Sequence, residues 1–411
     1  MWRHHLAVAV KVLLRRKIFT LVSLFGIVAT LVILVLIAAM LDHGFGPGPD
    51  TGRGRVLAVM RVSLFGDGGR MMSAQGTYAL FDRQARHLPG AENLAIFSSP
   101  IAADAFVDGR KQTLAMKRTD GGFWRVFSFA FLEGRPFTEA DVQRADFVAV
   151  VTASARDRLL GDGPAVGRPI EIGGQRFTIV GVVPDVSEMR NLPYADVWVP
   201  LTTERTPLDQ EGILGGYQAA LVAGPGASIA LIRETFDERV SRLELPAGMH
   251  RLVAPFETPF EGWARQMFPD DDPRSKAPRL IALLAVLGGL IALLPAVNLV
   301  NLNISRIMER SSEIGVRKAF GASSRALVAQ FVVENVLLTM VGAVLALVVS
   351  AALLGVINRS GLIAHAQLAV NVRIFLIGLG LALVFGVVSG VYPAWRMSRL
   401  HPVAALKGGA R

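Results

Sequence analysis

Residues 18–41 read IFTLVSLFGIVATLVILVLIAAML, and this run of 24 residues without a charged side chain decides the fold. An α-helix needs roughly 20 apolar residues to cross a bilayer. Lys11, Arg15, Arg16 and Lys17 stand directly before the run. A cleaved secretory signal has an apolar core of only about 7 to 15 residues and a small-x-small cleavage site, whereas this run ends Ala-Ala-Met-Leu. The sequence therefore predicts an uncleaved membrane helix.

The composition of the whole chain agrees with a membrane protein. Of 411 residues, 52% are hydrophobic and 18% are charged, whereas about a quarter of the residues of a soluble protein are charged. The formal net charge of +10 could indicate a nucleic-acid binder, but residues 42–279 carry −3 and the remainder +13. The basic excess thus lies beside apolar segments, which excludes nucleic acid as the expected partner. Because cysteine is absent, disulfides, thiolate metal sites and catalytic thiols are excluded.

Three further apolar runs lie in the C-terminal third, at Leu280–Ile304, Ala326–Val356 and Ile374–Trp395. Each is long enough to cross a bilayer, so we expect four membrane helices. If both chain ends are cytoplasmic, three flanking groups of basic residues all fall on the inner side, as the positive-inside rule requires. These groups are Arg3, Lys11, Arg15, Arg16 and Lys17; Arg306, Arg310, Arg317, Lys318 and Arg325; and Arg396, Arg399, Lys407 and Arg411.

The segment Asp42–Arg279, between the first two spans, is long enough for one or two folded domains. Its patterns alternate between strand and helix. We expect a Gly/Pro linker at 44–54, hairpins that turn at Asp108-Gly109 and at Gly173-Gly174, strands at 55–62, 195–200 and 218–223, and helices at 78–87, capped by Thr77, and at 229–243. The predicted fold class is an α-helical membrane protein with four transmembrane helices and a large α+β extracytoplasmic domain inserted between helices 1 and 2.

The predicted division of the chain is based on these segments. An amphipathic cytoplasmic helix at 1–17 precedes the first span at 18–41, and the extracytoplasmic domain occupies 42–279. The remaining parts are a second span at 280–305, a cytoplasmic segment at 306–325, a third span at 326–356, a fourth at 374–395 and a cytoplasmic tail at 396–411.

The cytoplasmic segment between the second and third spans has helix-forming residues up to Gly321, which can end a helix, and Ser323 can cap the next one. On charge alone it could be a basic loop that fixes the topology. However, Glu313–Ala322, EIGVRKAFGA, resembles the cytoplasmic signature EIGIRKALGA of the FtsX/MacB-type ABC transporter permeases, a mechanotransmission family. The segments 14–26, 166–184 and 392–406 are similar to the family's first span, outer-domain hairpin and C-terminal exit.

This resemblance implies a multi-pass permease of the inner (cytoplasmic) membrane that dimerises, with itself or with a second permease, and binds an ABC ATPase inside the cell. A periplasmic adaptor is an open further partner. The coupling segment seated on the ATPase would contain Glu313, Ile314, Gly315, Val316, Arg317, Lys318, Gly321 and Ala322.

The sequence indicates no catalysis on this chain. It lacks Gly-x-x-x-x-Gly-Lys-[Ser/Thr], the loop that wraps nucleotide phosphates, so ATP and Mg are expected on a partner ATPase and no cofactor here. The carboxylates of Asp270–Asp272 are interpreted as a solvated linker rather than a metal site. We see no aromatic cluster in the outer domain that would name a ligand.

Two intramembrane features stand out. Glu334 is the one ionisable residue within the apolar runs, and such residues are functional candidates by default. Asn298 lies at a similar depth, so a structural hydrogen bond between the second and third spans is favoured over proton coupling. The fourth span carries a small-residue stripe that allows close helix contact, either within the subunit or with a dimer partner: Gly378, Ala382, Gly386 and Gly390.

The leading hypothesis is the permease subunit of an export or extraction system that couples ATP hydrolysis on a separate subunit to motion of the outer domain. Two alternatives remain open. One is a non-transporting transmembrane regulator of a cell-wall hydrolase or a signalling partner, and the other is a membrane-anchored binding domain without an ATPase. The sequence does not name a cargo.

Overall fold

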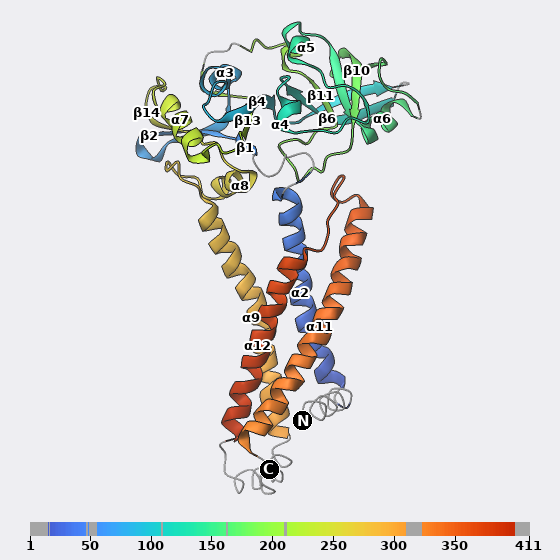
Figure 1. Cartoon of the computed structure of the whole chain (residues 1–411), viewed down its shortest axis with the longest axis vertical. Coiled ribbons are helices and arrows are strands. Elements are labelled where there is room, and N and C mark those ends of the chain that lie inside the picture. Colours follow the sequence, from blue (N-terminus) through green and yellow to red (C-terminus); the bar gives the residue numbers. More distant parts are fainter. Residues whose placement is uncertain are drawn as a thin grey trace. The chain divides into compact units, whose positions relative to one another are not determined.

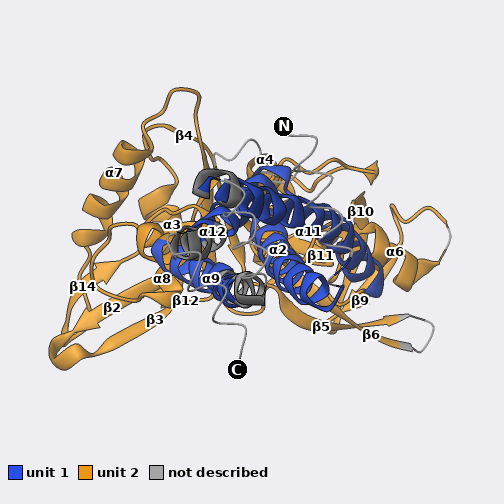
Figure 2. Cartoon of the chain, turned by 90° about the horizontal axis from the view of Figure 1, so that it is seen from below, with its two compact units in different colours: residues 1–42, 282–360, 368–411 blue, residues 43–281, 361–367 orange. Residues whose placement is uncertain are grey.

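The computed structural model of the chain describes residues 15, 17–46, 48, 56–107, 110–161, 163–208, 212–309 and 323–398. Two compact units make up the chain (Figure 2). The helical unit comprises Met1–Asp42, Ala282–Ser360 and Leu368–Arg411. The outer domain comprises His43–Ile281 together with Gly361–Gln367, a short segment from the C-terminal third of the chain.

The long helices are α2 (Lys17–Phe45), α9 (Ala277–Glu309), α11 (Ser324–Ser360) and α12 (Val372–Ser398). Among the described residues, two helices are long and apolar enough to cross a membrane, at Lys17–Phe45 and Val328–Ser360. The other two contain shorter described apolar stretches, at Ala277–Leu293 and Val372–Val388. Length and composition in the structure therefore support two of the four predicted spans.

The core of the helical unit joins α2 to α11 and α12. Four residues of α2, three of α11 and one of α12 form this cluster: Ile27, Leu31, Val32, Val35, Leu338, Ala343, Ala346 and Phe375. Large apolar side chains elsewhere on the same helices are exposed, including Phe25 at 77% and Val344 at 61%. Soluble proteins rarely expose such extended apolar surfaces, whereas helices that face lipid do so.

The described strands of the outer domain form one mixed sheet of 14 strands (Figure 1). Along the main path the order is β11-β8-β10-β9-β5-β6-β4-β13-β3-β2-β14. The strands are β1 (Val56–Val59), β2 (Val62–Gly66), β3 (Met71–Gly76), β4 (Ala91–Ser98), β5 (Ile101–Val107), β6 (Arg110–Thr119), β7 (Glu133–Gly134), β8 (Val148–Thr152), β9 (Pro169–Ile172), β10 (Gln175–Val183), β11 (Val197–Pro200), β12 (Leu214–Gly215), β13 (Tyr217–Ala223) and β14 (Met249–Val253).

Helices cover the two ends of this sheet. The domain contains α3 (Tyr78–Ala85), α4 (Phe123–Val126), α5 (Glu139–Gln143), α6 (Ala153–Leu160), α7 (Ile229–Ser241) and α8 (Pro259–Met267). At one end, α3 and α7 bury Phe81 and Phe236 against β1, β2, β4, β13 and β14. At the other end, α6 packs Ala155 and Leu159 on β8–β11. Both ends are visible in Figure 1.

Local turn and cap signals in the sequence predict several elements correctly. The side chain of Thr77 accepts the backbone N–H of Leu80 at the start of α3. Both predicted hairpins are present as antiparallel pairs, β5 with β6 and β9 with β10. Gly173 and Gly174 have φ angles of 58° and 70°, which glycine adopts without strain. The turn residues 108–109 lie outside the described part of the chain.

The prediction of one strand over 55–62 is wrong. The chain bends at Met60–Arg61, so that β1 pairs with β13 while β2 pairs with β3 and β14. All four residues of β1 are buried, whereas burial alternates along β2. The predicted run therefore contains β1, which is covered on both faces, and the start of β2, which is fully covered on one face only.

Candidate functional site

A buried polar cluster joins α11 to α12. The Asn335 side-chain amide donates to the carbonyl oxygen of Gly386 over 3.2 Å. One turn later, the Thr339 hydroxyl donates to the Asn335 carbonyl oxygen over 2.9 Å. Glu334, 2% exposed, accepts a hydrogen bond from Gln330 of its own helix over 3.2 Å. A hydrogen bond between neighbouring membrane helices fixes their relative register.

The described hydrogen bond between α11 and α12 comes from Asn335, whereas the sequence pointed to Glu334. The side chain of Asn298, the expected partner of Glu334, lies outside the described residues, so that hydrogen bond stays a prediction. Asn335 was not predicted as a contact residue, because the neighbouring Glu334 is the charged residue in this apolar run. Its spacing of four residues from Thr339 places both on one helix face and could have indicated it.

The small-residue stripe of α12 contacts helices of the same chain. A Cβ atom added at Gly386 would lie 2.9 Å from the Thr339 hydroxyl oxygen, and one added at Gly378 would lie 3.4 Å from Leu31 of α2. Ala382 packs against the helical core. The surroundings of Gly390 lie outside the described residues. The described stripe therefore lets α12 approach both α11 and α2 closely.

The predicted coupling segment, from Glu313 to Ala322, lies outside the described residues, as do residues 1–14 and 399–411. The backbone of the helix on its C-terminal side is described over its whole length. Helix α11 begins at Ser324 and runs without interruption to Ser360. At 1.5 Å per residue, its 37 residues span about 55 Å.

The short loop after α11 is part of the outer domain. The backbone N–H of Glu188 donates to the carbonyl oxygen of Ala364 over 3.3 Å. The Nδ1 atom of His365 lies 3.5 Å from the Asp185 carboxylate, whose other oxygen accepts the backbone N–H of Ser154. No local sequence signal indicates this contact of the loop with the rest of the outer domain.

Two hydrogen bonds close that loop at its base. The Asn358 side chain donates to the carbonyl oxygen of Leu368 and accepts the Leu368 backbone N–H, each over 2.9 Å. Because one side chain bridges the last turn of α11 and the segment before α12, the two ends of the loop are held together.

In the outer domain, α8 separates two cavities and is itself firmly held. Thr258 and Glu261 form a capping box at its N-terminus. Arg233 of α7 pairs with Glu261 over 2.6 Å and donates to the Phe256 carbonyl oxygen over 2.8 Å. A helix start satisfied in this way gives the side chains of α8 defined positions.

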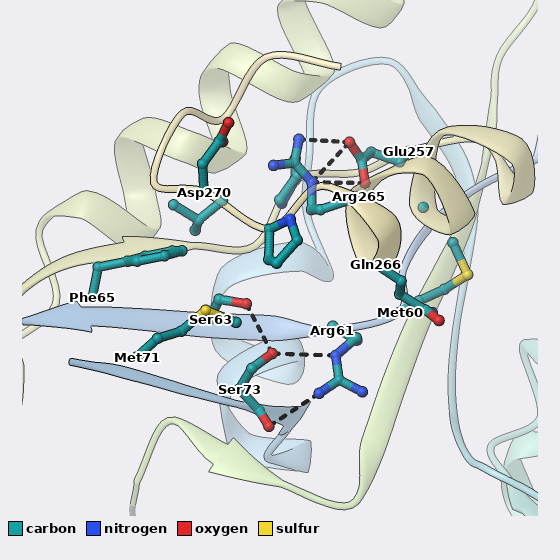
Figure 3. A pocket seen from close by; sticks show the side chains of 14 residues that line it. Met60, Arg61, Ser63, Phe65, Met71, Ser73, Glu257, Arg265, Gln266 and Asp270 are labelled. Atoms are coloured by element: carbon teal, nitrogen blue, oxygen red, sulfur yellow. Dashed lines mark hydrogen bonds and ion pairs between the residues drawn. The ribbon is translucent and has the colours of Figure 1, made fainter. Parts of the chain in front are cut away.

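The first cavity, which we call the Arg61 pocket, has a volume of about 280 Å³ and is polar on its floor (Figure 3). The Ser63 and Ser73 hydroxyls, opposite each other on β2 and β3, lie 2.9 Å apart. The Arg61 guanidinium donates to the Ser73 hydroxyl over 3.2 Å and to its carbonyl oxygen over 3.1 Å. Arg265 of α8 forms the opposite wall (Figure 3).

A buried ion pair stabilises that wall. Arg265 contacts both carboxylate oxygens of Glu257 over 2.7–3.0 Å and also donates to the carbonyl oxygens of residues 272–274. Burial raises the pKa of Glu257, and the hydrogen bonds from Arg265 oppose this shift. The pair fixes α8 to the segment that leads into α9.

The interpretation of Asp270–Asp272 as a solvated linker is wrong. Lys276, only 2% exposed, lies 2.5 Å from a carboxylate oxygen of Asp270 and 3.6 Å from one of Asp272. Arg274 and Arg279 pair with the same two carboxylates over 2.9 Å. No cluster of metal-ligating side chains occurs among the residues that the structure describes. Asp270 and Asp272 thus belong to a compact ion-pair network at the N-terminal end of α9.

The second cavity, which we call the Trp263 pocket, has a volume of about 430 Å³. The Phe45 and Trp263 rings stack with centroids 5.2 Å apart, and Phe260 meets Phe45 edge-on at 5.5 Å. The sequence alone did not indicate this ring cluster. The cluster was hidden because Phe45 and α8 are far apart in the sequence.

Two protein-family models match this chain, one in its N-terminal part and one in its C-terminal part. The family model described as MacB-like periplasmic core domain matches residues 18–239, more than half of the chain. The family model described as FtsX-like permease C-terminal matches residues 285–402. The chain belongs to the MacB/FtsX-like family of ABC transporter permeases. The family predicted from the sequence motifs is thereby confirmed, as is an α+β domain of the MacB type.

Individual relatives are distant. The macrolide export ATP-binding/permease protein MacB of Bdellovibrio bacteriovorus is 25% identical over 67% of this chain and 41% of its own length. The uncharacterized ABC transporter permease YvrN of Bacillus subtilis is 26% identical over 70% of this chain and 68% of its own length. The chain spans about two fifths of the length of that MacB relative. The crystal structure of the periplasmic region of MacB from Actinobacillus actinomycetemcomitans matches 52% of this chain and 91% of its own, with 14% identity and a TM-score of 0.38.

Proposed function

We propose that this chain is the membrane permease subunit of an ABC-type export or extraction system in the inner membrane. ATP hydrolysis on a separate ATPase subunit would drive motion of the outer domain, with four membrane helices and both chain ends in the cytoplasm. A second permease, identical or related, would complete the dimer. Permeases of this family work with ABC ATPases, and the 411 residues contain no phosphate-binding loop of their own.

The observation that best supports this function is the continuity of α11. The proposed coupling segment, 313–322, directly precedes α11, and the loop directly after α11 belongs to the outer domain. One helix of about 55 Å therefore connects the expected ATPase contact to the outer domain. An unbroken helix transmits axial displacement well because its backbone hydrogen bonds run along its axis.

Co-purification tests the proposal. The full chain, expressed with a candidate ABC ATPase subunit from the same genome, should retain that ATPase through detergent extraction. Changing Glu313→Ala and Arg317→Ala together should reduce the recovered ATPase at least tenfold, because the charged face of the segment is removed. Arg251→Ala, an exposed change in β14 of the outer domain, is the matched control and should leave recovery unchanged. Equal recovery with all three proteins would contradict the proposal.

A second measurement separates export from regulation. In proteoliposomes that hold the permease and its ATPase, an exporter should hydrolyse ATP faster when its cargo is present. A regulator should respond to its protein partner and to no small cargo. Acceleration by a protein partner alone would favour the regulator.

A further inference from the structure

The Trp263 pocket is a cavity of the outer domain for which the proposed force transmission gives no role. It is lined by the last turn of α2, by Val56 at the start of β1 and Met60 directly after it, by the segment 189–193 and by α8. Its volume of about 430 Å³ lies within the range of small-molecule sites, which begins near 300 Å³.

The walls of this pocket are apolar and rich in rings and sulfur. Phe45 and Trp263 supply stacked aromatic rings, while Met60, Met189 and Leu192 supply aliphatic and thioether surface. Aromatic rings and thioethers both form favourable contacts with the rings of a ligand. The described lining residues include no acidic side chain, and the polar ones that remain are Arg190, Asn191, Thr258 and Gln266. A small number of polar groups in an apolar pocket fixes the orientation of a bound ligand.

The pocket wall formed by segment 189–193 is held in place from behind. The amine of Lys117, which is fully buried, donates to the carbonyl oxygens of Asn191 and Leu192. The same amine lies 5.2 Å from the centre of the Phe97 ring. On the other side, the capping box and Arg233 fix α8. A wall that is already ordered lowers the entropic cost of binding.

We propose that the Trp263 pocket binds the ring-bearing apolar part of a small amphiphile, with its hydroxyl or carbonyl groups at the polar rim. The aromatic walls favour a ring system over an extended acyl chain. As a statement about cargo, this inference rests on the proposed export function. As a statement about binding, it does not, because the cavity lies wholly within the outer domain.

Photolabelling with 4-hydroxybenzophenone tests the site directly. This probe carries two rings and one hydroxyl, and its excited ketone bonds preferentially to methionine. Met189 is the diagnostic residue, because Met60 lines both the Trp263 pocket and the Arg61 pocket. The purified full chain, in nanodiscs of phosphatidylethanolamine and phosphatidylglycerol without ATPase or nucleotide, is irradiated at increasing probe concentrations. Labelled residues are then quantified by mass spectrometry.

Labelling of Met189 should saturate and exceed that of two comparison residues at least tenfold. These are Met71, 42% exposed beside the Arg61 pocket, and Met72, 45% exposed. Gln266→Trp, a change at an exposed rim position, should reduce Met189 labelling at least tenfold by filling the entrance. Met267→Trp, one residue further along α8 and 50% exposed, does not alter the lining and should leave labelling unchanged.

Competition defines the ligand class. Diphenylmethanol, which has the rings without the photoreactive ketone, should displace the probe, whereas dodecanoate at the same concentration should not. Displacement by dodecanoate would overturn the preference for rings. Labelling of Met189 that does not saturate, or that Gln266→Trp leaves unchanged, would overturn the site itself. Because no ATPase is present, these outcomes are independent of the co-purification that tests the proposed function.

Discussion

The outer domain and the helical unit hold their parts together by different chemistry. In the outer domain, buried ionisable groups such as Lys117, Asp120, Glu257 and Lys276 bind backbone atoms or opposite charges. Between α11 and α12, apolar side chains pack together, and the neutral amide of Asn335 donates a hydrogen bond to the carbonyl oxygen of Gly386. Charged contacts with strict geometry resist small displacements, whereas smooth helix surfaces permit them. Under the proposed function, this difference suits an outer domain that keeps its internal structure while the membrane helices shift against one another.

The largest expected effect comes from breaking the ion pair of α8. Arg265→Ala leaves the carboxylate of Glu257, which is 4% exposed, without its partner. Removing one member of a buried pair costs about 3–5 kcal/mol. The free energy of unfolding of the outer domain should fall by this amount, measured by tryptophan fluorescence during urea titration of the full chain. Arg251→Ala is the control. A loss below about 1 kcal/mol would show that this domain does not depend on its buried charges.

The second effect depends on pH and concerns Asp120. Burial raises the pKa of Asp120 to about 7, although the backbone N–H groups of Ile96 and Phe123 donate to its carboxylate. Since the folded state holds this proton more tightly than the unfolded state, the contribution of Asp120 is fully present below pH 4 and is lost as pH rises to about 7. One pKa unit corresponds to about 1.4 kcal/mol, so the loss approaches about 4 kcal/mol.

Asp120→Asn carries no titrating proton at this position and therefore isolates that contribution. We expect the difference in unfolding free energy between the wild type and the variant to change between pH 4 and pH 7, with the wild type losing ground as the pH rises. Thermal or urea unfolding at each pH measures it. A difference that stays constant over this range would contradict the assignment.

A smaller effect is expected in the helical unit. Gly386→Leu places a side chain against the Thr339 hydroxyl of α11, where even a Cβ atom would lie 2.9 Å away. Overpacking costs about 1–3 kcal/mol, so the thermal unfolding temperature in detergent should fall. Gly380→Leu, where nothing lies within 4 Å of an added Cβ atom, is the matched control. Equal effects of the two changes would show that the stripe does not control the contact between α11 and α12.

The smallest effect is expected at the loop seat. His365→Ala removes the contact with Asp185, a pair in which both side chains are about 30% exposed. Pairs of this kind contribute about 1 kcal/mol or less. Amide hydrogen exchange should accelerate in residues 361–367 and at Ser154, while the unfolding of the outer domain stays within about 1 kcal/mol of the wild type. Unchanged exchange in the loop would show that the backbone contacts alone hold it.

What could be predicted from the sequence depended on how local the signal was. The Thr77 cap and the Gly173-Gly174 turn were correct because neighbouring residues determine them. The family was predicted from the residues at 313–322 together with the stretches 14–26, 166–184 and 392–406, and the family models confirm it. The Phe45–Trp263 stack was invisible because only folding brings these residues together.

Burial was the other unpredictable quantity. Lys276 looks like an ordinary cation beside a run of acids, and only its 2% exposure distinguishes an organised network from a solvated linker. Asn335 likewise differs from any other amide in a helix only through the carbonyl oxygen of Gly386 that it meets. Periodicity identifies the elements of this protein, but it does not say which polar side chains lose contact with water.

The seat of the loop after α11 has one further consequence. The Glu188–Ala364 hydrogen bond and the His365–Asp185 contact resist separation as well as compression. Under the proposed function, α11 would then transmit a pulling displacement to the outer domain as well as a pushing one. The return of the outer domain to its starting position would then need no stored elastic energy, because the nucleotide cycle would drive the movement in both directions.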